Sequence, residues 1–270
     1  MSGDEEGAGR TRVIIIGAGI VGCSTAYYLR KKAEEKGVSL DIAVVDSVGI
    51  AAAASGRAGG FLARDWHGRG PTAELARRSF RLHAELAKVF GADKIGYRSV
   101  CAVQPTCPSP DTGTGCWFSS REDAPIISET SVSAQVIPER LVRSLFAASK
   151  ATLCVGHVNR VLKGSNGFHI EVEYETSLEE EDIEKRKGDV VKKTKSIFGS
   201  AVLFAAGPWT SDLVFEATGI QMKETVIGQK AASILLKPNE GAPPIDARML
   251  FVNWVGPGNP GELEVYPRID

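Results

Sequence analysis

The most constraining feature of this 270-residue sequence lies near its N-terminus, where an apolar, β-branched run leads directly into a glycine-rich turn. Val13–Ile16 is typical of a strand buried on both faces, as in a parallel sheet. The turn Gly17–Gly22 has glycine at its first, third and sixth positions. A helix-forming stretch over 24–36 and a second apolar run over 40–46 come next. Together these segments predict a βαβ unit that begins near residue 11.

Each glycine of this turn has a separate physical task. Gly17 permits a tight turn, Gly19 lets the backbone approach a pyrophosphate, and Gly22 lets the helix pack close to the strand. The start of the helix presents unpaired N–H groups and a positive dipole end to phosphate. Asp46 ends the second strand, where its carboxylate can accept hydrogen bonds from the hydroxyls of an adenosine ribose and would repel a 2′-phosphate. We predict a dinucleotide site here, with NAD and FAD both open because they share an ADP half.

Two later stretches favour FAD over NAD. The glycine-rich strip Ser55–Leu62 follows Asp46 within a dozen residues, where a nicotinamide dehydrogenase usually has an ordinary crossover helix. A second run, Val202–Trp209, contains Ala-Ala-Gly around 190 residues after the first turn. Both stretches would let the backbone pass close to an extended ligand. An NAD-dependent dehydrogenase stays open as an alternative.

These residues give the sequence a family resemblance. It resembles the D-amino-acid-oxidase-like (DAO) superfamily of FAD-dependent oxidoreductases. Residues 58–66 and 75–80 look most like a little-characterised eukaryotic branch found in fungi and plants. The resemblance rests on four motifs in the family's order, which span nearly the whole chain: Ile16–Gly22, Ala54–Gly60, Gln135–Pro138 and Ala205–Trp209.

The resemblance implies which residues would contact FAD. The glycine-rich turn would meet the pyrophosphate, and Asp46 the adenosine ribose. Residues 55–57 would lie along the phosphates and the ribityl chain, and 59–62 beside the isoalloxazine edge. The backbone of Val158 would pair with adenine, and the run over 206–209 would close around the flavin. The implied contact set is Gly17, Gly19, Ile20, Gly22, Asp46, Ser55, Gly56, Arg57, Gly59, Gly60, Phe61, Leu62, Val158, Ala206, Gly207 and Trp209.

The resemblance also implies oxidation of a small amine or amino acid. A hydride would pass from the carbon beside the substrate nitrogen to flavin N5, giving an imine, and oxygen or another acceptor would reoxidise the flavin. Arg64 and Arg268 are candidates for a substrate carboxylate, because arginine forms bidentate pairs with carboxylates. Structural salt bridging is the alternative for each. A non-catalytic flavin-binding or interaction protein also stays open.

Charge, cysteine and histidine content disfavour several other classes. With 32 basic and 33 acidic residues, the chain gives no electrostatic reason to expect nucleic acid or an anionic membrane as a partner. Five cysteines without a CxxC pair and four histidines without HxH or HExxH spacing predict no disulfide framework and no metal site. Cys23 is interpreted as a buried packing residue and His67 as a loop residue. No run approaches the about 20 apolar residues that span a bilayer, and the acidic start resembles no leader, so we expect a cytoplasmic protein.

We predict an α/β fold of two domains. A Rossmann-type FAD-binding domain would comprise 11–90 and 135–215, and a β-rich substrate domain 91–134 and 216–270. Family members continue past the equivalent of 266–268 with a glycine-rich strand and a helix. We therefore expect this chain to lack that part and to bind FAD weakly alone. Further expected elements are helices over 72–90 and 138–148, strands over 99–103 and 168–174, a third buried parallel-type strand over 200–204 and a solvated hairpin loop over 178–195.

Overall fold

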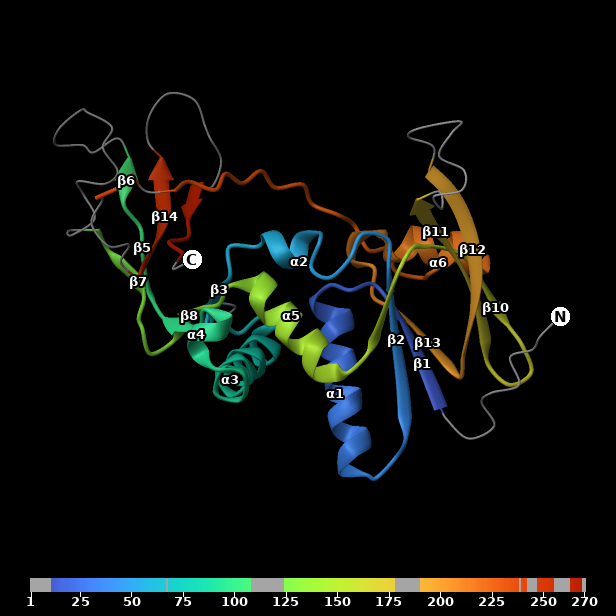
Figure 1. The fold of residues 1–270 in the computed structure, drawn as a ribbon. Coiled ribbons are helices and arrows are strands. Elements are labelled where there is room, and N and C mark those ends of the chain that lie inside the picture. Colours follow the sequence, from blue (N-terminus) through green and yellow to red (C-terminus); the bar gives the residue numbers. More distant parts are fainter. Residues whose placement is uncertain are drawn as a thin grey trace. The chain divides into compact units, whose positions relative to one another are not determined.

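The computed structural model describes residues 11–66, 68–107, 124–177, 190–237, 239–241, 247–254 and 263–268. The chain is a mixed α/β fold, as predicted, and its elements are labelled in Figure 1. It divides into two compact units. Unit 1 comprises Met1–Arg57 and Val142–Ser233, and unit 2 comprises Ala58–Leu141 and Ile234–Asp270. The helix over 73–90, which the sequence-based division places in the FAD-binding domain, belongs to unit 2 by its contacts. Which ligand each unit binds stays a prediction.

Unit 1 is built on a parallel sheet whose described strands follow the order β13-β1-β2-β9. The predicted βαβ unit is present, with β1 and β2 paired in parallel and α1 between them in sequence. Helix α1 begins at Ile20 rather than near residue 24, because Gly19 already serves as its N-cap. The elements are β1 (Thr11–Ile16), α1 (Ile20–Glu35), β2 (Leu40–Asp46), β9 (Thr152–Val155) and β13 (Ala201–Phe204).

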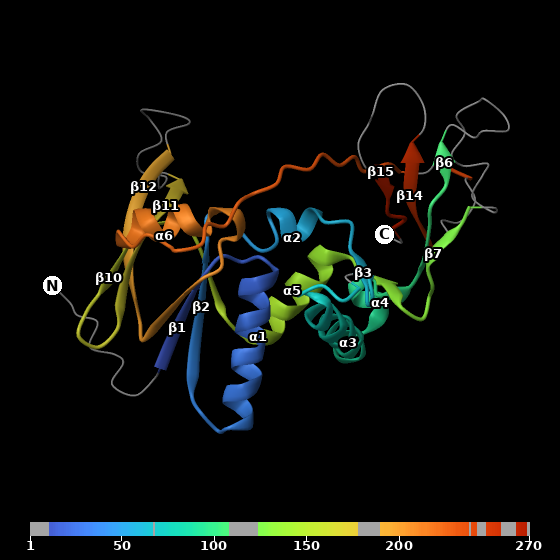
Figure 2. The ribbon, with the colours of Figure 1, turned by 180° about the vertical axis from the view of Figure 1, so that it is seen from behind.

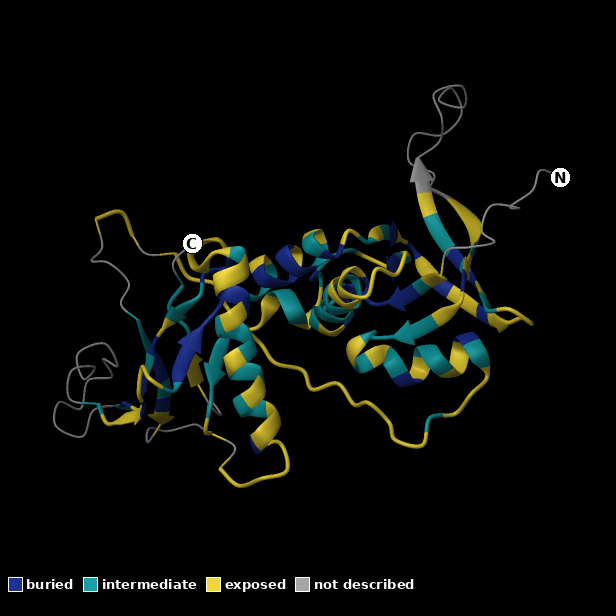
Figure 3. Ribbon diagram, turned by 90° about the horizontal axis from the view of Figure 1, so that it is seen from below, coloured by how far each residue is buried: buried dark blue, intermediate teal, exposed yellow. Residues whose placement is uncertain are grey.

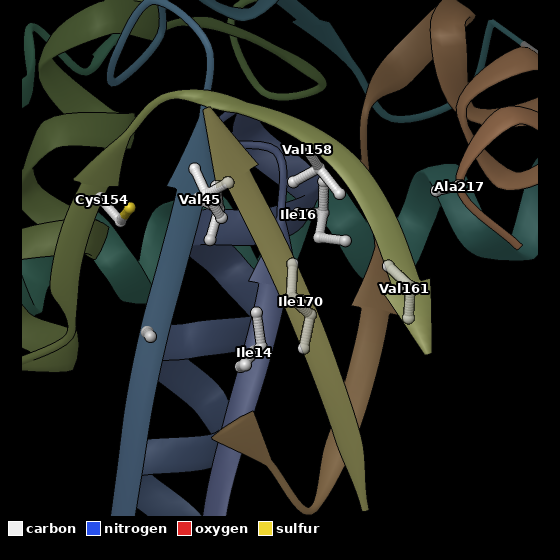
Figure 4. Packing of buried hydrophobic residues seen from close by; sticks show 10 residues of the cluster. Ile14, Ile16, Val45, Cys154, Val158, Val161, Ile170 and Ala217 are labelled. Carbon is white, nitrogen blue, oxygen red and sulfur yellow. The ribbon is translucent and has the colours of Figure 1, made fainter. Parts of the chain in front are cut away.

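The two faces of this sheet are covered by different elements, because side chains alternate along a strand. Ile15 points toward α1, since a Cβ built on Gly22 would lie 3.2 Å from its Cγ2 atom, and Figure 2 shows α1 alongside β1 and β2. Ile14 and Ile16 point the other way, into a buried cluster (Figure 4). That cluster includes side chains of β10 (His157–Lys163), β11 (Phe168–Ser177) and α6 (Thr210–Thr218).

The antiparallel sheet β10-β11-β12 corrects one expectation from the charge pattern. Strand β12 runs from Val190 to Gly199 and pairs with β11 from its first residue. Residues 190–195 are therefore strand and not loop, while the rest of the expected loop, 178–189, lies outside the described residues. The antiparallel ladder can hold exposed lysines because its outer face needs no apolar side chains.

Two other strand predictions were wrong in detail. Strand β13 is parallel to β1, as expected, but Ala201 is exposed and the rest of the strand is only half-buried, because β13 lies at the end of the strand order. The expected strand over 99–103 is two strands in two different sheets. Arg98–Ser99 (β4) pairs with β8, whereas Cys101–Val103 (β5) pairs with β14.

The described part of unit 2 contains two sheets and several helices. One sheet has the order β15-β14-β5-β7 with β6 paired to β14, and the other has the order β3-β8-β4. The short helix α2 (Ala54–Arg57) ends at the boundary of unit 1, and α5 (Pro138–Ser149) runs across it. The remaining elements of unit 2 are β3 (Phe61–Ala63), α3 (Ala73–Phe90), α4 (Ala92–Ile95), β6 (Thr106–Cys107), β7 (Ile126–Ser128), β8 (Ser133–Gln135), β14 (Arg248–Trp254) and β15 (Leu263–Val265).

Burial separates core from surface along the helices (Figure 3). On α3, Leu86 is buried, but Leu75 and Val89 are 67% and 62% exposed. The large apolar side chains of this helix are therefore buried only in part. Among the described residues, no helix combines the length and the apolar character needed to cross a membrane.

Candidate functional site

The carboxyl ends of the parallel strands in unit 1 carry the residues predicted there. Gly17 follows β1, Asp46 ends β2, Gly156 follows β9 and Ala205 follows β13. In a parallel sheet these ends share one edge. The chain moves outward from β1 through β2 to β9, and β13 then returns to the other side of β1. The edge beside β1 is therefore a topological switch point, the place where open parallel sheets bind ligands.

Two of the three motif glycines are required by the protein's own packing. A Cβ on Gly17 would lie 2.2 Å from the carbonyl oxygen of Ala205, and Gly17 has φ of +114°. A Cβ on Gly22 would lie 1.9 Å from the carbonyl oxygen of Gly17. No side chain fits at either distance. These glycines let β1, α1 and the segment after β13 approach one another.

Gly19 differs from the other two glycines. Apart from its two chain neighbours, its nearest neighbour among the described residues would be the hydroxyl oxygen of Ser55, 3.0 Å from a built Cβ, and no backbone atom of the other described residues lies within 4 Å of that position. The fold therefore gives a weaker reason for glycine here than at Gly17 and Gly22. A bare backbone at this point is what close approach of a pyrophosphate requires, so the turn fits the group that the sequence predicts.

The start of α1 carries a positive dipole end that the helix itself does not neutralise. Its first turn contains no acidic residue, and the N-cap Gly19 has no side chain to act as a cap. Instead, the N–H of Ile20 donates to the hydroxyl oxygen of Ser55 at 2.9 Å. Ser55 comes from α2, so the predicted phosphate-contacting segments 17–22 and 55–57 meet within unit 1.

Asp46 ties the turns after β1 and β2 together. Its Oδ2 accepts the N–H of Ala18 at 2.8 Å, and its Oδ1 accepts those of Val48 and Gly49 at 2.9 and 2.8 Å. A carboxylate offers about four acceptor sites, so one stays available for a hydroxyl. The residue thus has a structural role that its sequence position alone does not reveal.

The remaining predicted residues of unit 1 are placed as follows. Val158 has its side chain in the core, and the β10–β11 register shifts just after it, which disturbs the backbone ladder there. Gly56 packs against the carbonyl of Ala51, and Arg57 is exposed at the end of α2. Beyond β13, Ala206 precedes a short 3₁₀ helix, η2 (Gly207–Trp209), in which Trp209 is 59% exposed.

In unit 2, two of the sequence motifs meet at strand β3. The N–H of Val136 donates to the carbonyl of Gly60, and Phe61 and Leu62 pair with β8. A Cβ on Gly59 would lie 2.3 Å from the ring of Tyr266, so this glycine makes room for an aromatic ring. Burial, together with the hydrogen bond to Glu264, raises the pKa of Tyr266. Phe61, Trp66, Phe251 and Tyr266 form an aromatic cluster.

A polar pair beside this cluster was not predicted. Arg98 donates from Nε to the Oε1 atom of Gln135 at 3.1 Å, and from Nη2 to the carbonyl of Pro267 at 2.8 Å. Gln135 is 2% exposed, and within the described part of the chain its Nε2 has no hydrogen-bond partner. Gln135 belongs to one of the four family motifs but was given no role, and the spacing of Arg98 gave no signal.

The two arginines predicted as candidates for a substrate carboxylate both interact with other residues of the protein. Arg64 donates from Nε to Asp65 at 2.8 Å, which is the salt bridge weighed as the alternative to substrate binding. Arg268 is half-buried and interacts within the described structure. His67 lies outside the described residues. Among the residues that are described, no group of histidine, cysteine and acidic side chains is arranged to hold a metal ion.

Cys23 lies directly behind the glycine-rich turn. It is completely buried, and its Sγ contacts the carbonyl oxygen of Ala18 at 3.4 Å. Burial first, and then the nearby charge of Asp46, raise the pKa of the thiol to about 12. Because the thiolate is the nucleophile, these observations support a packing role.

We therefore expect Cys23 to resist alkylation in the folded protein. Iodoacetamide at pH 8.5 should label the half-buried Cys101 faster than Cys23, and unfolding in urea should make Cys23 reactive, because its pKa then falls toward 9.0. Mass spectrometry of tryptic peptides measures both sites in one sample. Rapid labelling of Cys23 in the folded protein would contradict the packing role.

Comparisons with known proteins agree with this geometry. Residues 12–260 match the family DAO, described as FAD dependent oxidoreductase. The "Putative oxidoreductase C1F5.03c" of Schizosaccharomyces pombe is 32% identical over 215 residues, which are 75% of this chain and 56% of that protein. The "Putative oxidoreductase TDA3" of Saccharomyces cerevisiae is 36% identical over 99 residues, 35% of this chain and 18% of that protein. The fungal likeness expected from the sequence is confirmed.

Two solved structures share the fold. Glycine oxidase from Bacillus cereus has a TM-score of 0.51 and 22% identity, covering 76% of this chain and 57% of that one. L-amino acid deaminase from Proteus vulgaris has a TM-score of 0.50 and 19% identity, covering 77% and 50%. This chain thus spans about half the length of these proteins. The prediction of FAD rather than NAD is confirmed at the level of the family: the chain belongs to the DAO family of FAD dependent oxidoreductases.

Proposed function

We propose that unit 1 binds the ADP half of FAD at the carboxyl edge of its parallel sheet, and that the protein oxidises an amine or amino acid. The observation that carries the first part is the bare backbone of Gly19 at the acid-free start of α1, beside Asp46 and at the switch point of the sheet. This arrangement offers an anion a positive helix end and offers a ribose a carboxylate.

Each residue of this edge has a proposed task. Gly19 and Ile20 would meet the pyrophosphate, with Ser55 beside them because it already shares the N–H of Ile20. Asp46 would accept a ribose hydroxyl with its remaining acceptor site. Gly17 and Gly22 act indirectly, by keeping the turn and α1 in place. The rest of the predicted contact set stays a prediction.

The substrate part of the proposal follows the family. When bound, FAD supplies a hydride acceptor at the flavin N5 atom, which suits oxidation of a C–N bond to C=N. The protein's own residues orient the two partners and exclude water. An amine that enters uncharged needs little further acid–base help. The names of two structures that share this fold, a glycine oxidase and an L-amino acid deaminase, support an amino acid as the substrate class.

The cofactor and the activity have separate tests. Because this chain alone is expected to bind FAD weakly, the protein is first incubated with excess FAD. We expect the bound flavin to absorb in the blue and to be released as FAD on denaturation, and a panel of amino acids to bleach it without oxygen. A colourless protein that binds NADH instead would overturn the proposal. Stoichiometric FAD without reduction by any amine or amino acid would leave the non-catalytic flavin-binding alternative in place of an oxidase.

The role of Gly19 is tested by comparing three alanine variants. Gly19→Ala should fold normally, because only the Ser55 hydroxyl must shift, yet it should weaken FAD binding about tenfold or more, equivalent to roughly 1.4 kcal/mol. Gly22→Ala should unfold the protein. The control is Gly164→Ala, whose Cβ meets nothing closer than 3.7 Å. Thermal melting and FAD titration measure both effects. Unchanged FAD affinity in Gly19→Ala would show that the pyrophosphate lies elsewhere.

Asp46 should contribute to both stability and FAD binding. Asp46→Ala removes the acceptor of three backbone N–H groups as well as the proposed ribose contact. We expect FAD binding to weaken by about 1–3 kcal/mol, the scale of hydrogen bonds to a charged group. Asp46→Asn should retain more stability, because its amide oxygen still accepts. The matched control is Asp41→Asn, a half-buried carboxylate on the same strand that pairs with Arg12. FAD titrations indistinguishable between Asp46→Asn and Asp41→Asn would contradict the ribose role.

A further inference from the structure

Unit 2 contains a surface pocket whose walls are rich in arginine. It has a volume of about 460 Å³ and is lined by Arg64, Asp65, Arg77, Phe80, Arg81 and Ala84, hereafter the arginine pocket. Every lining residue belongs to unit 2. A cavity of this size is in the usual range for small-molecule sites.

One helix supplies most of the lining. Arg77, Phe80, Arg81 and Ala84 lie on α3 at spacings of three and four residues, which place their side chains on one face of a helix. The face alternates cationic heads with apolar groups, and the methylene stems of the arginines add to the apolar area. Arg64 and Asp65, directly after β3, complete the lining from a separate segment.

Asp65 holds two of the arginines in place by accepting a hydrogen bond from the Nε atom of each. Its Oδ2 accepts from Arg64 at 2.8 Å and its Oδ1 from Arg77 at 3.2 Å. These bonds hold the pKa of Asp65 below its ordinary value, so it stays ionised at neutral pH. Arg77 also donates from Nη2 to the carbonyl of Gly68 at 3.2 Å. Within the described structure, both Nη groups of Arg64 remain without a hydrogen-bond partner.

The arginines outnumber the carboxylate that pairs with them. Three guanidinium groups line the pocket against the single carboxylate of Asp65. Arg81 forms an ion pair with the exposed Glu74, 4.0 Å from Nη2 to Oε1, with side chains 59% and 78% exposed. Such an exposed pair is worth little. The pocket therefore has excess positive charge and free N–H donors in the planar geometry that matches a carboxylate.

We propose that the arginine pocket binds a small organic acid, whose carboxylate pairs with the guanidinium groups and whose apolar part lies against Phe80 and Ala84. Phe80 and Ala84 favour such a ligand over inorganic phosphate, because phosphate has no apolar part to pack against a ring or a methyl group. The pocket is a ligand site of unit 2 in its own right and requires no flavin.

The proposal is tested by calorimetric titration with phenylacetate, benzylamine and inorganic phosphate. Phenylacetate should bind, and it should bind more tightly than phosphate, while benzylamine should not bind. Arg81→Gln should weaken phenylacetate binding roughly 10- to 100-fold, the loss of a hydrogen bond between charged groups. The matched control is Arg78→Gln, which removes the same charge from an exposed position on the same helix outside the pocket. Melting curves check that both variants fold.

The variant Phe80→Ala distinguishes the contribution of the ligand's ring from that of its carboxylate. It should weaken phenylacetate but leave acetate unchanged, since acetate has no ring to pack. Equal losses in Arg81→Gln and Arg78→Gln, phosphate binding as tightly as phenylacetate, or no binding of phenylacetate would each overturn the proposal. The titrations are run with and without added FAD. Phenylacetate binding that does not depend on FAD supports this site even if the proposed flavin function fails.

Discussion

The structure of unit 1 depends on two glycines whose backbone packs directly against other backbone. Gly17 lies against the carbonyl of Ala205, and Gly22 against the carbonyl of Gly17. Through these contacts the turn after β1, the first turn of α1 and the segment after β13 occupy a space too small for any side chain. The buried faces of β1 then follow: Ile15 meets α1, and Ile14 and Ile16 meet the second sheet. Because the same contacts put strand ends and helix start together, one packing constraint sets both the core and the candidate site.

Much of this part was predictable because its determinants are local in sequence. A β-branched run, a turn with glycine at fixed positions and a helix-forming stretch are each specified by a few adjacent residues, and β2 has the bounds that its apolar run predicts. The position of Asp46 at the end of that strand was evident for the same reason. Its three hydrogen bonds to backbone N–H groups were not, since they depend on how two turns meet in space.

The features that the sequence did not reveal all depend on long-range pairing. Strand β13 looked like a buried strand from its composition, but its place at the end of the strand order leaves it half-exposed. The contact of Arg98 with Gln135 and the arginine pocket both join residues from separate elements. The sequence predicted a helix over 72–90 but no binding face on it. Only the position of Arg64 and Asp65 after β3 turns that face into one wall of a cavity.

The packing of Tyr266 on Gly59 links two positions more than 200 residues apart in the chain. With the ring in place, any side chain at position 59 would overlap it, so substitution there requires a smaller residue at 266 first. A large residue at 266 in turn is acceptable only while 59 remains glycine. The pair should therefore change together during evolution, and in a fixed order, with the aromatic residue lost before the glycine. Among related sequences, glycine at the position of residue 59 should thus be the more persistent of the two.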